Sequence, residues 1–394
     1  MYKNIIFRIA LVFGMFNVIF FNSLHTYNPS QSVYDGDDLL VYSKVWLDKA
    51  TGFNFGYLSR CNNSYKRCDD DYNENIIDSS FLYTSTPALF QNIISKSVET
   101  SLVDINNISL ISKSILFLVL SYYLIIVFKV NGYLVSTLMF ILLLFNQQLL
   151  SNSSHVYLLI GLKFLPIVIL YSILNKPKVN KYEFLLLFFS TLTVFSSGLE
   201  FLSSIVISFI LVAYYKKSKN FYFYMFFTFI CAASLNIFLQ MYITNSTINE
   251  VISHLLQRFS DRGLSLTTDI DQIDVYYSSI KDSSTLTNVL SHYLSENFFS
   301  FNLFGKTIFS LDWFSFIYVS FLLVAYNKSI KFLKLLILSI MASFSWYFLF
   351  FSHSSTPEHY HIDWLALYMP LYFFLFPDVI NQSIFAYKKV FDNE

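Results

Sequence analysis

Apolar segments long enough to cross a lipid bilayer recur along almost the whole chain. A helix needs about twenty apolar residues to span the hydrocarbon region, and the bilayer offers an unpaired backbone no hydrogen-bond partner. Only 13% of the 394 residues are charged, which is about half the share of a soluble domain. We therefore expect an all-α polytopic protein, with residues 1–394 forming one membrane domain.

The apolar segments predict about ten transmembrane helices. In chain order they cover 5–22, 111–129, 133–150, 156–174, 183–197, 201–215, 220–243, 311–326, 332–351 and 363–380. The first resembles a signal peptide, but no small-residue cleavage site follows it, so we expect it to remain as a helix. The segments 183–197 and 201–215 are short enough to be re-entrant.

Basic residues fall in every second gap between these segments. Short cytoplasmic loops are enriched in lysine and arginine, so the alternation predicts that both termini are cytoplasmic. The basic sets are Lys3 and Arg8, Lys129, Lys176 with Lys178 and Lys181, Lys216 with Lys217 and Lys219, Lys328 with Lys331 and Lys334, and Lys388 with Lys389. All 7 histidines and nearly all carboxylates then fall on the other side. Long outer loops hold more polar residues of every kind, yet the histidines favour a chemical site on that side.

Two long segments, 23–110 and 244–310, are predicted on the outer side. Each contains apolar residues at helical spacing, at 37–49 and 247–259, and the first of these helices fits the membrane surface. Cys61 and Cys68 could pair in an oxidising compartment. Cys231 lies in an apolar segment and is expected in the core.

An acidic group opens the helix predicted at 37–49. Asp35, Asp37 and Asp38 stand around Gly36, which lets the backbone approach a ligand closely. The group fits a solvated helix cap, or a site where a carboxylate takes a proton. A divalent metal ion is a lower-ranked alternative, because paired carboxylates suit a hard cation.

The segment from Asp37 to Asn54 resembles a motif of the GT-C superfamily of membrane glycosyltransferases. In that family an acidic pair follows the first transmembrane helix, opens a juxtamembrane helix and leads to a Gly-x-Asn-like turn. The likeness spans about twenty residues; Lys44 stands where the pattern often has arginine, and the turn is one residue off. The resemblance implies that Asp37 or Asp38, with Asp35 in reserve, is the general base that deprotonates the acceptor hydroxyl.

A histidine-rich segment precedes the last predicted helix and contains His353, His359 and His361, with Asp363 behind them. Membrane proteins of bacterial polysaccharide loci, which are similar to GT-C enzymes, carry a similar motif there. The resemblance implies that the histidines bind the phosphate of a polyprenyl-phosphate sugar donor or orient the acid. A zinc site that adds Glu358, and a loop at the lipid headgroups, are the alternatives.

Four more residues are candidates for donor or acceptor contacts. Glu200 follows Gly198 in a turn that resembles one in polysaccharide-locus proteins, and is otherwise an ordinary loop residue. Lys163 lies about two turns into its predicted helix, where a lysine needs a partner such as a phosphate, unless the helix starts later and the side chain is interfacial. Arg258 and Arg262 are phosphate ligands or part of a solvated helix face.

Taken together, the sequence and its resemblances predict a GT-C-like glycosyltransferase of the bacterial inner membrane. It would move a sugar from a polyprenyl-phosphate donor to a glycan or glycolipid acceptor on the extracytoplasmic side, without a nucleic-acid partner. No glycine-rich nucleotide loop is present, which agrees with a lipid-linked donor. An O-antigen or capsule polymerase, a lipid-linked-sugar flippase and, more weakly, a membrane O-acyltransferase are the alternatives.

Overall fold

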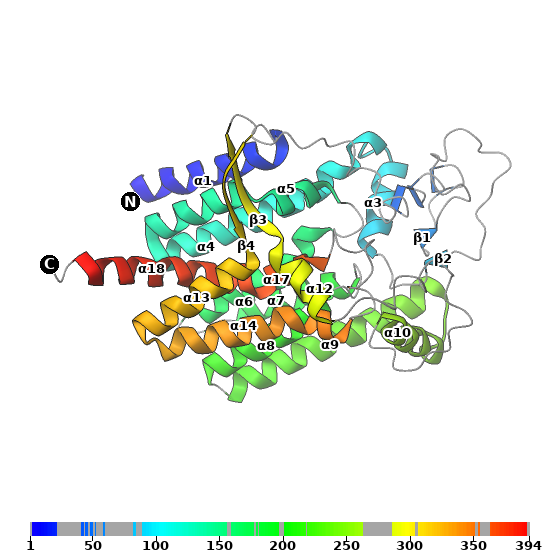
Figure 1. Ribbon diagram of the computed structural model, residues 1–394. Helices are drawn as coiled ribbons and strands as arrows, with labels where there is room; N and C mark the ends of the chain where they lie inside the picture. Colours follow the sequence, from blue (N-terminus) through cyan, green and yellow to red (C-terminus); the bar gives the residue numbers. More distant parts are fainter. Residues whose placement is uncertain are drawn as a thin grey trace.

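The long helices of the chain run alongside one another (Figure 1). The computed structural model describes residues 2–21, 41–42, 44–45, 48–49, 52, 58–59, 82–83, 89–155, 159–176, 179, 181–196, 201–217, 219–262, 286–303, 306–350, 354 and 363–391. The described chain begins and finishes at one end of the bundle, which we call the terminal end (Figure 1). At the opposite end, the distal end, lie α3 (Leu89–Glu99), β1 (Leu58–Ser59), β2 (Leu82–Tyr83) and α10 (Ile248–Arg262).

Within the described residues, four helices are long and apolar enough to cross a bilayer: α1 (Tyr2–Phe21), α4 (Ile108–Leu144), α9 (Lys219–Thr244) and α14 (Ile330–Leu349). Three shorter apolar helices accompany them: α6 (Ile160–Leu174), α8 (Leu202–Lys216) and α13 (Trp313–Asn327). Helix α7 (Lys181–Ser196) contacts α6 and α9. Large apolar side chains are exposed on these helices, for example Ile6 and Phe226, as expected of surfaces that face lipid. The prediction of a helical, membrane-associated protein is confirmed at this level.

Helix α4 consists of two segments that meet at Gly132. This residue has φ of +82° and ψ of −169°, a conformation that is open to glycine and strained for other residues. Tyr133, next to the break, donates a hydrogen bond to Asn4 near the start of the chain. Ser112, near the other end of α4, donates to the His155 carbonyl at 2.8 Å. The chain therefore reverses at Gly132, where the sequence predicts a short loop between two helices.

The segment predicted as one helix at 363–380 is divided in the structure. A short helix α17 (Leu365–Leu367) leads into a π-helical turn, Tyr368–Leu375, in which Met369 is not helical, and α18 (Phe376–Phe391) follows. The π-helical residues are all buried, and they contact α6, α8, α14 and α18. The prediction of a single regular helix was wrong, because this segment forms the packed centre of the bundle, where neighbouring side chains set its path.

Both segments that are predicted as helices outside the membrane, 37–49 and 247–259, contain helical residues at the distal end (Figure 1). The described residues within 41–49 are mostly helical, and Val41 and Val45 are fully buried. Helix α10 begins after Thr247, whose backbone N–H and hydroxyl both donate to Glu250, a reciprocal capping arrangement. Cys231 is half-buried on α9 rather than in the core, whereas Cys61 and Cys68 lie outside the described residues.

The sequence did not predict the elements between α10 and α13. Helix α12 (Leu286–Ser295) is followed by an antiparallel hairpin of β3 (Asn297–Leu303) and β4 (Lys306–Asp312). The hairpin is fixed to the bundle by Phe298, whose ring lies 4.4 Å from that of Trp313, and by the Ser300 N–H, which donates to the Phe145 carbonyl. The described chain is thus not strictly all-α.

Candidate functional site

Most of the predicted site residues lie outside the described residues. They are Asp35, Asp37, Asp38, Glu200, His353, His359 and His361. Arg258 and Arg262 lie on the C-terminal half of α10. The roles expected of all of these residues therefore remain predictions.

Lys163 is fully buried in α6. The helix begins at Ile160, so the lysine lies in its first turn and not two turns inside it as the sequence predicts. The side chain is nevertheless enclosed rather than interfacial. The backbones of α6 and α4 lie close here, because a Cβ atom at Gly161 would come 2.7 Å from the Leu116 nitrogen. Close approach through a small residue is typical of membrane helices.

A half-buried carboxylate, Glu296, lies at the junction of α12 and β3. Its Oε2 atom accepts a hydrogen bond of 2.6 Å from the Gln148 side chain, and its Oε1 atom is 3.3 Å from His292 Nε2. Gln148 belongs to α5 (Gln147–Ser151), which follows α4. Two segments far apart in the sequence thus meet at this carboxylate.

Glu296 has an unusual proton affinity for a carboxylic acid. Burial raises its pKa from 4.5 to about 7, and the hydrogen bond from Gln148 lowers it by less. Burial also lowers the pKa of His292, so the imidazole beside Glu296 is mostly neutral at pH 7. A carboxylate with a pKa near the working pH is suited to taking and returning a proton.

The polar network continues from Gln148 into the core of the bundle. The Tyr368 hydroxyl donates to Asn146 Oδ1 at 2.6 Å and lies 3.4 Å from Gln148 Oε1. Asn146 also caps α5 by accepting from the Leu149 N–H. Phe164, the neighbour of Lys163, stacks on the Tyr368 ring. The buried lysine therefore lies one residue from a side chain that packs against this network.

A second carboxylate, Asp363, belongs to the same region. Its Oδ2 atom accepts from Ser354 at 2.8 Å, and its carbonyl accepts from the Tyr347 hydroxyl. Tyr293 of α12 donates to the Ser354 carbonyl. The carboxylates of Asp363 and Glu296 are both close enough to act on Tyr347 electrostatically. We call Gln148, His292, Glu296, Asp363 and Tyr368 the distal polar network.

Asp363, a member of this network, is hydrogen-bonded to the described residue at the other border of the histidine-rich segment, Ser354. Ser354 follows His353 in the chain, and Asp363 comes two residues after His361. The hydrogen bond between Ser354 and Asp363 therefore joins the two described residues that border 355–362, which lie outside the described part. The sequence predicts a donor site in this segment, and the described residues on its two sides, Ser354 and Asp363, lie beside or within the distal polar network.

A buried ion pair lies elsewhere in the distal part of the chain. Lys44 donates to both carboxylate oxygens of Asp48, at 2.6 and 2.5 Å, and Ser95 of α3 donates to the same carboxylate. The side chains of Lys44 and Asp48 are 3% and 1% exposed. Burial lowers the pKa of Lys44, and Asp48 opposes that change. This lysine of the predicted motif is thus engaged in an ion pair within its own helix, and the same Asp48 carboxylate is bonded to Ser95 of α3.

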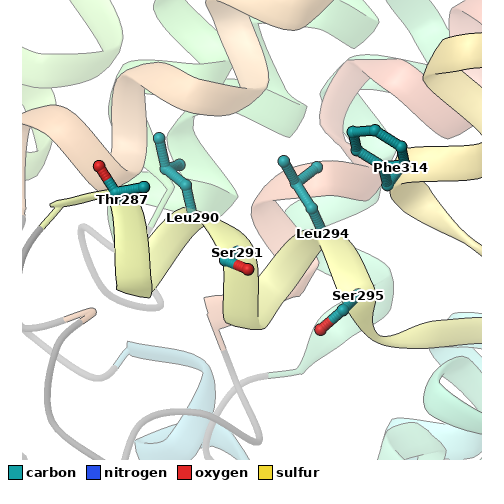
Figure 2. A pocket seen from close by; sticks show the side chains of 6 residues that line it. All are labelled: Thr287, Leu290, Ser291, Leu294, Ser295 and Phe314. Carbon is teal, nitrogen blue, oxygen red and sulfur yellow. The ribbon is translucent and has the colours of Figure 1, made fainter.

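A groove runs along the face of α12 that is turned away from Tyr293. It has a volume of about 350 Å³ and is lined by Thr287, Leu290, Ser291, Leu294, Ser295 and Phe314. Figure 2 shows that Leu290 and Leu294 point in one direction, and that Phe314 of α13 lies beside Leu294. The groove is mainly apolar and is separated from the distal polar network by α12.

Metal binding finds no support in the described part of the chain, where no three His, Cys, Asp or Glu side chains gather as a ligand set. The predicted metal alternatives involve Asp35, Asp37 and the histidines, which lie outside it. Sequence reasoning missed Glu296 and Gln148. The only signal was a histidine and a glutamate four residues apart, at 292 and 296.

Comparisons with protein-family models, with curated proteins and with solved structures find no match to this chain.

Proposed function

We propose that this chain is a membrane glycosyltransferase with its site at the distal end. It would transfer a sugar from a polyprenyl-phosphate donor to a glycan or glycolipid acceptor on the extracytoplasmic side, with both termini in the cytoplasm. The observation that carries the proposal is the Glu296 carboxylate, which is half-buried and accepts a hydrogen bond from Gln148. Like Asp363, which follows the histidine-rich segment, it acts on Tyr347 electrostatically.

The reaction needs one base and one group that receives the leaving phosphate. A carboxylate removes the proton from the acceptor hydroxyl as its oxygen attacks the anomeric carbon. The bond between that carbon and the phosphate oxygen breaks, the glycosidic bond forms, and polyprenyl phosphate leaves. Glu296 is our first candidate for the base, and Asp37, Asp38 or Asp35 is the alternative that the family resemblance implies.

The leaving phosphate requires cationic or hydrogen-bonding partners. His353, His359 and His361 remain the proposed donor ligands, because their segment borders the distal polar network. Lys163 is proposed to contribute positive charge, since it lies next to Phe164, which stacks on Tyr368. Glu200, Arg258 and Arg262 keep their proposed roles as acceptor and phosphate contacts.

Transfer is tested with purified full-length protein, radiolabelled hexoses and N-acetylhexosamines on polyprenyl phosphate, and cell-envelope glycans and lipids as acceptors. We expect label in the acceptor fraction, and a loss of about 10²–10⁴-fold in rate for Glu296→Gln. Glu99→Gln is the matched control, because Glu99 pairs with Lys96 on α3 at the same end. Its rate should stay within about twofold of wild type.

Three results would count against the proposal. If no sugar of the panel becomes covalently linked, the protein is not the proposed transferase. If the intact donor moves from one leaflet of a vesicle membrane to the other and no glycosidic bond forms, the protein is a flippase. A ladder of repeating units would identify a polymerase. If Glu296→Gln and Glu99→Gln lose the same fraction of the transfer rate, Glu296 is not the base, although the protein still transfers sugar.

A further inference from the structure

Lysines concentrate at the terminal end of the bundle. Its described cations include Lys3, Arg8, Lys129, Lys176, Lys181, Lys216, Lys217, Lys328, Lys331, Lys334, Lys388 and Lys389. The described carboxylates there are Glu183, which pairs with Lys176, and Asp378, which interacts with Lys331. Positive charge therefore exceeds negative charge by a wide margin on this surface of the described chain.

Part of this charge gathers where α8 ends and α14 begins. The Tyr215 hydroxyl donates to the Lys331 carbonyl at 2.8 Å, which joins the two helices. Lys334 Nζ lies 5.9 Å from the centre of the Tyr214 ring. Lys331 and Lys334 are one turn apart and so share one side of α14. We call Tyr214, Lys216, Lys217, Lys331 and Lys334 the basic corner.

Like charges held together repel one another unless an anion lies between them. Lys216 donates to the Lys176 carbonyl and is half-buried. Lys217, Lys331 and Lys334 are exposed. Within the described part of the chain, no carboxylate forms an ion pair with Lys217 or Lys334. The corner thus offers several cationic groups to an external anion.

Apolar side chains extend from the basic corner toward the middle of the bundle. On α14, Ile337 and Met341 follow Lys334 at helical spacing and are 44% and 56% exposed. On α8, Ile210 precedes Tyr214 by one turn and is 56% exposed. A free phosphate would use only the lysines. A phospholipid would use both the lysines and these two apolar stripes.

We propose that the basic corner binds an anionic glycerophospholipid. The headgroup phosphate lies against Lys331, Lys334 and the lysines at the end of α8, and the acyl chains lie along the apolar stripes of α8 and α14. The inference does not depend on the transferase activity, because the corner and the distal polar network are at opposite ends of the bundle.

Lipid binding is measured by native mass spectrometry of the full-length protein in detergent, titrated with dioleoylphosphatidylglycerol or dioleoylphosphatidylcholine. The wild type should bind the anionic lipid at least about tenfold more tightly. Lys331→Gln with Lys334→Gln should weaken that binding about thirtyfold, since each lysine near an anionic lipid contributes to affinity. Lys331→Arg with Lys334→Arg should retain it.

The matched control is Lys49→Gln with Lys96→Gln, which removes the same charge from exposed residues of the distal part. It should bind the anionic lipid as the wild type does. Equal affinity for both lipids, or an equal loss in the control, would overturn the proposal. Displacement of the lipid by sn-glycerol 3-phosphate at matched concentration would also overturn it, because the ligand would then be a soluble phosphate. The far-ultraviolet circular dichroism of each variant confirms that it is folded.

Discussion

Two carboxylates of the distal part of the molecule, Asp48 and Glu296, are taken out of water in different ways. Asp48 is almost fully buried and is bonded to Lys44 and Ser95. Glu296 is half-buried, and its described partners are the neutral Gln148 side chain and an imidazole whose pKa is lowered by burial. The first arrangement pairs the carboxylate with a cation and bonds it to a residue of a second helix, α3. The second raises the pKa of the acid and leaves it accessible to a ligand.

The difference separates a structural role from a chemical one. Removing one partner of a buried ion pair leaves a charge without compensation, which destabilises the fold. A perturbed carboxylate in an accessible polar network is a candidate for proton transfer. The comparison predicts that the loss of Lys44 lowers stability, whereas the loss of the Glu296 carboxylate lowers activity without lowering stability.

The largest expected effect on stability is at the ion pair. Lys44→Met should lower the free energy of unfolding by about 3–5 kcal/mol, because Asp48 remains buried without its cation. Lys49→Met, on an exposed neighbour, should change it by less than about 0.5 kcal/mol. Denaturant titration in detergent micelles measures both. Equal and small effects would show that the Lys44–Asp48 pair does not stabilise the fold.

Replacing Glu296 should have a smaller effect on stability than replacing Lys44, and it should stabilise the protein above pH 7 rather than destabilise it. Its pKa is about 7 in the folded protein and 4.5 without burial, so the folded state binds the proton more tightly. The free energy of unfolding therefore falls as the pH rises from about 4.5 to 7, and stays low above it. Glu296→Gln removes this term, and its melting temperature should exceed that of the wild type at pH 8.

Measuring Glu296→Gln and the wild type at pH 4.5 provides the control for this prediction. At pH 4.5 the Glu296 carboxylic acid is protonated in the folded state, and the two proteins should melt at similar temperatures. A variant that is less stable than the wild type at pH 8 would mean that Glu296 supports the fold.

The smallest expected effect is a shift in the pKa of Glu296 rather than a loss of activity. The hydrogen bond from Gln148 lowers the pKa of Glu296, so Gln148→Met should raise that pKa further. The pH at which transfer reaches half its maximum should move upward. Asn152→Leu is a matched control, because Asn152 is on the neighbouring turn and donates to the Gln148 carbonyl rather than to Glu296. An unchanged midpoint in Gln148→Met would contradict the assigned bond.

Several features of the fold follow from the sequence alone because they depend on local pattern. Apolar runs of sufficient length predict membrane helices such as α9 and α14, and apolar residues at helical spacing predict a helix over 247–259, where α10 lies. The gap between the apolar segments 111–129 and 133–150, with Lys129 at its edge, predicts the reversal within α4. Each of these signals lies within a few residues of the structure that it specifies.

The hairpin and the distal polar network could not be predicted in this way. The phenylalanines of β3 resemble the apolar residues of the helices around them, and the strand is fixed by contacts with Phe145 and Trp313. Glu296 and Gln148 are 148 residues apart. Their proximity depends on tertiary packing, which a single sequence does not reveal. Lys163 is an intermediate case, since its helix was predicted but its burial in the first turn was not.

The most direct test of the central claim is the pH dependence of transfer by the wild-type protein. Glu296 acts as a base only when it is deprotonated, so kcat/KM should rise about tenfold per pH unit below a midpoint near pH 7. In Gln148→Met, the midpoint of this rise in kcat/KM should move to higher pH. A rate that stays constant from pH 5 to 8, or a midpoint at the pKa of an ordinary carboxylate, would contradict the assignment and favour Asp37 or Asp38 as the base.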